Sequence, residues 1–170
     1  MRITAVSAAV ALTLVCVSTS LYGQRPDDQI DPRSIALVKK GDAARAAGEL
    51  QRATDLYETA LAVDPRNREA FVDMAVVAKR QGLTGKAIRL YREALKLDPT
   101  DLAALRGQGE AMVAKGAVTS AEENLKKMRK ICGATCSQAD QLAAVIRRGP
   151  PEQATATAQQ DVEPKPAGDD

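Results

Sequence analysis

The chain contains no histidine and no tryptophan, and aromatic residues make up only 2% of its 170 residues. Without histidine, neither a Ser-His-Asp nor a Cys-His arrangement for nucleophilic catalysis can be built, and metal chemistry that depends on imidazole ligands is excluded. No glycine-rich phosphate loop follows a strand, since the sequence offers no convincing strands. We therefore expect a protein that is not an enzyme and that uses no metal and no cofactor.

The charge of the chain is nearly balanced, with 24 Lys and Arg against 22 Asp and Glu and a formal net charge of +2. Proteins that bind nucleic acid usually present a strongly basic surface, and those that bind single strands add aromatic side chains on which bases stack. Both features are lacking. We therefore expect no nucleic-acid partner.

The sequence repeats itself every 34 residues. Five positions of the first copy, Gly48, Ala53, Tyr57, Ala60 and Pro65, return as Gly82, Ala87, Tyr91, Ala94 and Pro99, and then as Gly116, Ala121, Leu125, Met128 and Gly133. A fixed period of this length indicates a solenoid, in which each unit must stack on its neighbours to bury its apolar face. A binding surface is therefore more to be expected than an active site.

Each copy has the pattern of a helix, a tight turn, a second helix and a stop. In the first copy, Gly41 and Ala53 are small enough to let two helices approach closely, and Gly48 between them tolerates the left-handed conformation that ends a helix. Pro65 then stops the second helix, and Asn67 can cap the next one, as Asp101 can one copy later. The sequence thus predicts helical hairpins.

This pattern resembles the tetratricopeptide repeat (TPR) family from about Ser34 to Ile131. The resemblance implies an all-α fold: an α-solenoid of three helix-turn-helix repeats (34–67, 68–101 and 102–135) with a C-terminal capping helix (137–148). Lys40 departs from the family by occupying a usually apolar position, and Met128 and Gly133 stand where Ala and Pro are expected.

The resemblance also implies that the first helix of each repeat lines a concave groove, which receives a peptide or a helix of another protein. The candidate partner-binding residues are Val38, Lys39, Asp42, Arg45, Glu69, Val72, Asp73, Val76, Lys79, Arg106 and Glu110. For any one of them the alternative is a solvated helix face. The clamp that holds a chaperone tail in some family members needs Lys, Asn or Arg where this chain has Val38, Asp42, Asp73, Ala103 and Gly107. A terminal carboxylate is therefore not the expected ligand.

The two ends of the chain differ from the repeats. Met1 and Arg2 precede an apolar stretch over residues 3–17 and then small residues, which predicts a secretory signal over 1–23 followed by a polar linker over 24–33. The alternative is an uncleaved anchor, because residues 3–21 approach the roughly 20 that span a bilayer. At the other end, residues 149–170 lack aromatic side chains and are predicted to form a disordered tail.

Cys132 and Cys136 lie four positions apart, where the third copy departs from its pattern. If Cys16 leaves with a cleaved signal, these two are the only thiols, and in an oxidising compartment they are expected to form a disulfide. The disulfide would staple a turn in which Gly133 ends one helix and a capping box that begins at Ser137 opens the next. The alternative is a redox or metal role, although three intervening residues differ from the two of thioredoxin-like motifs, and a zinc site would lack its usual histidine partners.

The helix expected after this turn carries an amphipathic stripe formed by Ala139, Leu142, Ala143 and Ile146. We therefore expect it to shield the exposed end of the repeat stack.

Together these features predict a non-catalytic scaffold or adaptor of the bacterial cell envelope that binds another protein. It would be periplasmic or secreted, and it would meet the inner membrane only if the N-terminal segment stays uncleaved. Two alternatives remain open: a thiol-active accessory protein that uses Cys132 and Cys136, and a membrane-anchored TPR subunit of an envelope assembly complex. The resemblance names no partner.

Overall fold

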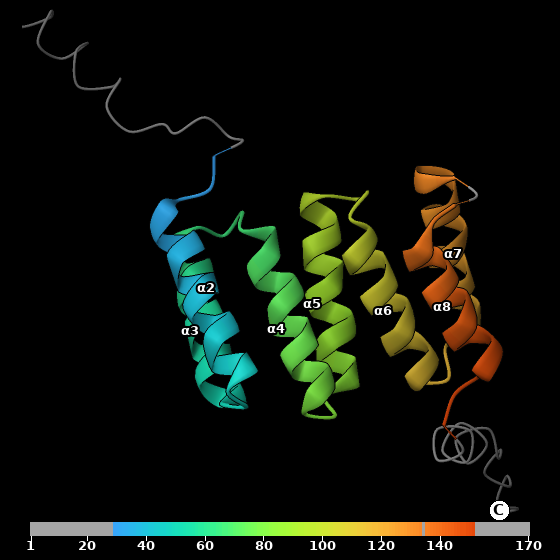
Figure 1. Ribbon diagram of the computed structural model, residues 1–170, viewed down its shortest axis with the longest axis horizontal. Coiled ribbons are helices and arrows are strands. Elements are labelled where there is room, and N and C mark those ends of the chain that lie inside the picture. Colours follow the sequence, from blue (N-terminus) through green and yellow to red (C-terminus); the bar gives the residue numbers. More distant parts are fainter. Residues whose placement is uncertain (1–28, 134, 152–170) are drawn as a thin grey trace, which may run out of the picture. The chain divides into compact units, whose positions relative to one another are not determined.

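The computed structural model describes residues 29–133 and 135–151, and within them the chain forms helices and no strand (Figure 1). The helices are α2 (Pro32–Ala46), α3 (Leu50–Val63), α4 (Arg68–Arg80), α5 (Thr84–Leu97), α6 (Leu102–Ala114), α7 (Val118–Cys132) and α8 (Ser137–Arg148). All of these helices belong to one compact unit. The predicted signal over 1–23, most of the linker and nearly all of the tail lie outside the described residues.

The helices pack in consecutive hairpins. α2 packs against α3, α4 against α5 and α6 against α7, while α3 contacts α4 and α5 contacts α6, so each hairpin lies beside the next one. The last helix, α8, packs against both α6 and α7. This arrangement is the predicted all-α solenoid of three TPR-like repeats with an added C-terminal helix.

The glycine turns of the three hairpins were predicted correctly. Gly48, Gly82 and Gly116 have φ angles of 81°, 75° and 83°, in the left-handed region that favours glycine. In the first hairpin, the N–H of Glu49 donates a 2.9 Å hydrogen bond to the carbonyl oxygen of Ala44, which closes a Schellman motif. The turn thus satisfies a carbonyl group that the end of α2 leaves free.

The predicted caps of α4 and α6 are confirmed. Asn67 accepts a hydrogen bond from the N–H of Ala70, and Asp101 accepts one from the N–H of Ala104 at 3.0 Å. The sequence did not predict the cap of α2, where Asp31 accepts from the N–H of Arg33 and Pro32 occupies the first turn. This helix therefore begins at Pro32, two residues before the predicted first repeat.

The predicted capping box at Ser137 is wrong. α8 already includes Ser137, so Cys136 occupies the N-cap position, and no side chain makes a capping hydrogen bond there. The hydroxyl of Ser137 is one residue too far into the helix to act as its cap. The α8 stripe is confirmed, because Ala139, Leu142 and Ala143 are buried and Ile146 packs against the same cluster.

The predicted close approaches between helices are confirmed by the core. Ala53 and Ala87 are fully buried, and a Cβ atom at Gly41 would overlap the ring of Tyr57. Met128, where the repeat family has Ala, is also fully buried and fills the C-terminal cluster with Leu105 and Leu142. The side chain of Met128, which is larger than the alanine of the family, thus fills the part of the core that α8 covers.

Candidate functional site

The predicted groove residues lie on the first helices of the three repeats, α2, α4 and α6, which contact one another in order. Lys39 and Glu69 are exposed, and most of the other candidates are half-buried, namely Asp42, Arg45, Val72, Asp73, Val76, Lys79, Arg106 and Glu110. Val38 is different. It is only 2% exposed and belongs to the main hydrophobic cluster, so this apolar side chain is part of the core and not of the groove surface.

Four side chains on α2, α3 and α4 form one hydrogen-bonded network. The hydroxyl of Tyr57 donates to Asp42 Oδ1 at 2.9 Å and accepts from Arg45 Nε at 3.1 Å. Arg45 Nη2 also lies 2.8 Å from Asp42 Oδ1 and 3.3 Å from Asp73 Oδ1. Three predicted site residues therefore bind one another, partly through the hydroxyl of Tyr57, which the sequence marked only as a position of the repeat.

Burial has changed the acidity of this network. Burial, together with the negative charge of Asp42, raises the pKa of Asp73 to about 6, although the positive charge of Arg45 acts in the opposite direction. Burial and the hydrogen bond to Asp42 also raise the pKa of Tyr57, so its hydroxyl stays protonated as a donor. The network holds its carboxylates in place and leaves one of them costly to ionise.

A second polar network joins α4, α6 and α8. Lys79 Nζ forms an ion pair of 2.5 Å with Glu110 Oε2, and Arg106 Nη1 donates to Gln141 Oε1 at 2.5 Å. Arg106 Nη1 is also 3.8 Å from Glu110 Oε1. These contacts hold the second and third repeats against each other and fix the positions of three charged side chains.

Between α4 and α6 lies a hollow of about 330 Å³, here called the α4–α6 pocket. It is lined by Val72, Val76, Lys79, Arg80, Tyr91, Ala103, Arg106, Gly107 and Glu110. Five of the eleven predicted groove residues therefore line one pocket, which has apolar residues beside fixed charges. The sequence did not single out Tyr91 for this site, whereas Gly107 stands at a predicted groove position, where the earlier repeats have Lys39 and Asp73.

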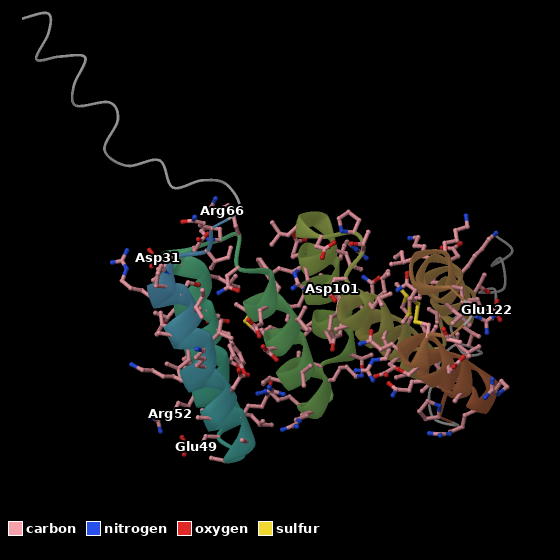
Figure 2. The ribbon with its side chains drawn as sticks, turned by 45° about the horizontal axis from the view of Figure 1, so that its top comes forward. Asp31, Glu49, Arg52, Arg66, Asp101 and Glu122 are labelled. Atoms are coloured by element: carbon pink, nitrogen blue, oxygen red, sulfur yellow. A yellow bond between two sulfur atoms is a disulfide. The ribbon has the colours of Figure 1, made fainter. Side chains whose placement is uncertain are left out.

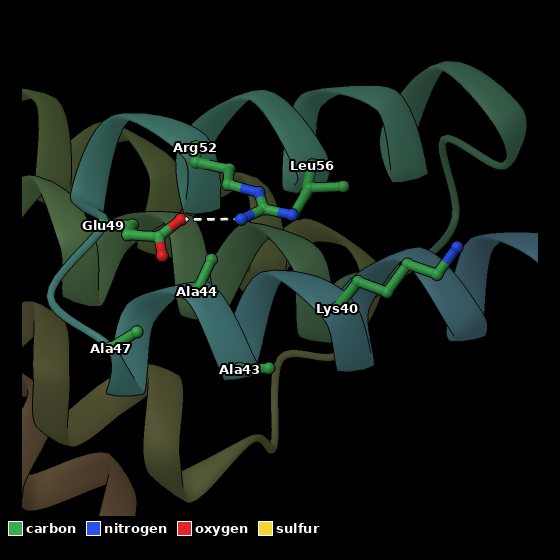
Figure 3. A pocket seen from close by; sticks show the side chains of 7 residues that line it. All are labelled: Lys40, Ala43, Ala44, Ala47, Glu49, Arg52 and Leu56. Carbon is green, nitrogen blue, oxygen red and sulfur yellow. Dashed lines mark hydrogen bonds and ion pairs between the residues drawn. The ribbon is translucent and has the colours of Figure 1, made fainter.

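A second hollow, of about 320 Å³, opens on the first hairpin between α2 and α3 (Figure 3). Its lining includes Lys40, Ala43 and Leu56, and the ion pair between Arg52 Nη1 and Glu49 Oε2 crosses it at 2.8 Å. Figure 2 shows Glu49 and Arg52 at the turn end of this hairpin, opposite the end that carries Asp31.

The face of the first hairpin that holds this hollow is the one that later repeats bury. One repeat after Lys40 and Ala43, Met74 and Val77 are buried, because α3 packs against α4 there. α2 is the first helix that the structure describes, so no described helix covers the corresponding face. The lysine in the usually apolar position thus lies at an exposed end of the stack, where its charge stays solvated.

Cys132 ends α7 and Cys136 precedes α8, and the structure joins their Sγ atoms, with the Cα atoms 5.7 Å apart. This Cα separation is within the usual range for a disulfide. Gly133, with a φ of 74°, ends α7 as predicted. The formation of the bond in the cell stays a prediction.

Within the part of the chain that the structure describes, the Cys, Asp and Glu residues form no group of three or more that could hold a metal ion. Among residues 29–133 and 135–151, no helix has both the length and the apolar character required to cross a membrane.

Several solved structures of TPR domains are similar to this one, whereas no curated protein matches the chain. The Sgt2 TPR domain from Aspergillus fumigatus is 25% identical, with a TM-score of 0.66 over 87% of this chain and 95% of that one. The first TPR domain of Spaghetti (RPAP3), bound to an HSP90 peptide, is 19% identical, with a TM-score of 0.64 over 71% and 97%. The TPR2B domain of yeast Sti1, in a complex with pHsp70, is 18% identical, with a TM-score of 0.64 over 69% and 98%.

One protein family matches most of the chain. The family described as the Cilia and flagella-associated protein 70 middle TPR-like domain matches residues 41–169, from the middle of α2 to beyond α8. The repeat pattern, the stacked hairpins and this match agree, and the chain therefore belongs to the family of the Cilia and flagella-associated protein 70 middle TPR-like domain.

Proposed function

We propose that this protein is a non-catalytic interaction scaffold that binds a peptide or a helix of another protein along α2, α4 and α6. The α4–α6 pocket is the observation that carries the proposal, because it places Val72 and Val76 beside the charged Lys79 and Arg106. Apolar walls with a few fixed polar groups are typical of a site that selects one ligand. The peptide complexes of the Spaghetti and Sti1 domains support this assignment.

The bound segment differs from a chaperone tail in how it is held. A clamp for a terminal carboxylate needs cationic or amide side chains, and this chain instead places Asp42 and Asp73 within the network of the first two repeats. The carboxyl groups of Asp42 and Asp73 disfavour the binding of a third carboxyl group, such as a partner's C-terminus, at this place. The groove therefore takes an internal stretch of its partner instead of a free C-terminus.

A pair of variants tests the use of the pocket. Ala103→Leu places extra methyl groups in the α4–α6 pocket, whereas Ala62→Leu makes the same change at an exposed position of α3. Proteins that co-purify with the full-length chain are compared by quantitative mass spectrometry after in-cell crosslinking. We expect partners to be lost from Ala103→Leu and retained by Ala62→Leu, with both variants equally stable. Equal recovery of every partner by the two variants would show that the pocket is not used.

We further propose that the scaffold works in the bacterial cell envelope, which the pattern of residues 1–23 supports. Fractionation of cells that express a C-terminally tagged chain, followed by N-terminal sequencing of the recovered protein, tests this. A mature chain that begins after the predicted signal supports export, and an intact chain in the membrane fraction supports the anchored alternative. An intact chain in the cytoplasm contradicts both.

A further inference from the structure

Tyr57 and Tyr91 occupy the same position in successive repeats, but the surroundings of their hydroxyl groups differ. Tyr57 bonds Asp42 and Arg45, whereas the corresponding residues one repeat later are Val76 and Lys79. The hydroxyl of Tyr91 makes no hydrogen bond to any residue that the structure describes, although the side chain is only 2% exposed. The hydroxyl oxygen itself is not fully enclosed, so water or a ligand in the α4–α6 pocket can reach it and act as its hydrogen-bond partner.

Gly107 determines where this hydroxyl lies. A Cβ atom at Gly107 would overlap the phenol end of Tyr91, and both residues line the α4–α6 pocket. The ring of Tyr57 instead lies against Gly41 of its own repeat, a position that Ala75 occupies in the second repeat. Because Gly107 has no side chain, the phenol end of Tyr91 can lie at the wall of the pocket.

A second donor beside the pocket is also unpaired. Arg106 Nε is buried and has no hydrogen-bond partner, even though Nη1 of the same side chain binds Gln141. An Arg Nε–H can only donate, and a tyrosine hydroxyl that lacks a partner donates readily to an anion. Both unpaired groups therefore fit a ligand that accepts hydrogen bonds.

The charges that line the pocket favour an anion. Three cations, Lys79, Arg80 and Arg106, face one carboxylate, Glu110, and that carboxylate is already paired with Lys79 at 2.5 Å. Burial raises the pKa of Tyr91 to about 12, so its hydroxyl keeps its proton at neutral pH. The apolar part of the lining, Val72, Val76 and Ala103, suits the aliphatic side chains of a peptide and not a free inorganic ion.

We propose that the α4–α6 pocket binds the side-chain carboxylate of an internal Asp or Glu of the partner peptide, through the Tyr91 hydroxyl and the guanidinium group of Arg106. The residues that flank this acid in the peptide are aliphatic and contact Val72, Val76 and Ala103. This inference rests on the proposed scaffold function and specifies what the scaffold recognises.

The test is a selection from a random peptide library displayed with fixed sequence on both sides, so that no displayed peptide offers a free terminal carboxylate. The bait is the full-length chain. We expect the enriched peptides to share an acidic residue between aliphatic ones, and Tyr91→Phe to bind them about tenfold more weakly. Replacing the peptide's Glu with Gln weakens the wild type by a similar factor and weakens Tyr91→Phe little further, as expected for two groups in contact.

Matched variants separate this contact from general effects of charge and fold. Arg106→Gln lowers the affinity, whereas Arg92→Gln removes the same charge from an exposed position of α5 and leaves the affinity unchanged. Tyr91→Phe keeps the ring and loses no hydrogen bond within the described chain, so its unfolding curve should match that of the wild type. Enriched peptides without a shared acid, or equal binding by wild type and Tyr91→Phe, would overturn this proposal but leave the scaffold function standing. A library that yields no binder at all would overturn both.

Discussion

Asn67 Nδ2 donates a buried hydrogen bond of 2.8 Å to the Oγ of Ser34, 33 positions earlier in the chain. Ser34 Oγ in turn donates to the carbonyl oxygen of Ala60 at 2.7 Å. The Oδ1 atom of the same Asn67 accepts from the N–H of Ala70 and so caps α4. One amide thus links the start of the second repeat to both helices of the first.

We expect Asn67→Ala to lower the free energy of unfolding by about 2 to 3 kcal/mol, because it removes a helix cap and leaves a buried hydroxyl with one partner fewer. Asn67→Asp keeps the capping oxygen but loses the donor to Ser34, so its loss should be smaller. Urea denaturation followed by circular dichroism measures both. A loss below about 0.5 kcal/mol for Asn67→Ala would show that water replaces these hydrogen bonds without cost.

The features that were predictable from the sequence are those that depend on near neighbours in the chain. A glycine such as Gly82 ends its helix by its own conformational freedom, and Asn67 caps a helix that starts at the next residue. Periodicity then located the hairpins, because the same residue types recur at a fixed distance. These signals were sufficient for the fold and for the order of its helices.

The details of the site depend on contacts across repeats, which a pattern of residue types does not contain. Val38 was predicted to line the groove, yet it is buried, because its position in the repeat does not specify how closely the neighbouring helix packs. The pairing of Asp42, Arg45 and Asp73 requires three helices to be in place. The contact between Tyr91 and Gly107 is visible only when the second and third repeats are stacked.

The two repeat tyrosines should respond differently to loss of their hydroxyl groups. Tyr57→Phe removes hydrogen bonds to Asp42 and Arg45 and should cost about 1 to 2 kcal/mol of stability. Tyr91→Phe breaks none within the described residues and should change stability by less than about 0.5 kcal/mol. Parallel urea titrations of the two variants give the comparison. Equal losses would contradict the difference in environment between the two hydroxyls.

The raised pKa of Asp73 predicts how stability depends on pH. Its carboxyl group has a pKa of about 6 in the folded protein against an ordinary 3.8, so between these values the folded state binds more protons than the unfolded state. Stability contributed by this group is therefore present below about pH 4 and lost as the pH rises through 6. Because Asn does not ionise, the free energy of unfolding of Asp73→Asn should rise by about 1 to 3 kcal/mol relative to that of the wild type as the pH increases from 4 to 7.

Urea denaturation at intervals of one pH unit checks this prediction. Glu58→Gln removes a carboxylate from an exposed position of α3 and is the matched control, for which we expect a curve nearly parallel to that of the wild type. A parallel curve for Asp73→Asn as well would mean that Asp73 ionises as easily in the folded chain as in the unfolded one.

The last prediction concerns Cys132 and Cys136, because it separates a structural disulfide from a redox role. Replacing both with Ser should lower stability by up to about 2 kcal/mol, the range for a short closed loop. The loss should be local, since solenoid repeats couple mainly to their neighbours and α8 packs mainly against α6 and α7. Hydrogen exchange should therefore speed up in α8 while amides of α4 keep their protection.

A thiol-active protein would behave differently in the same variants. The double Ser variant would lose its activity but keep its fold, and the wild-type pair would be reduced readily in a glutathione buffer, at potentials well above the roughly −300 mV below which structural disulfides lie. A structural disulfide resists this reduction, and the double Ser variant still binds the partner of the groove, because the α4–α6 pocket contains neither cysteine. Titration of the wild-type chain against glutathione, combined with partner binding by the variant, therefore decides between the two roles.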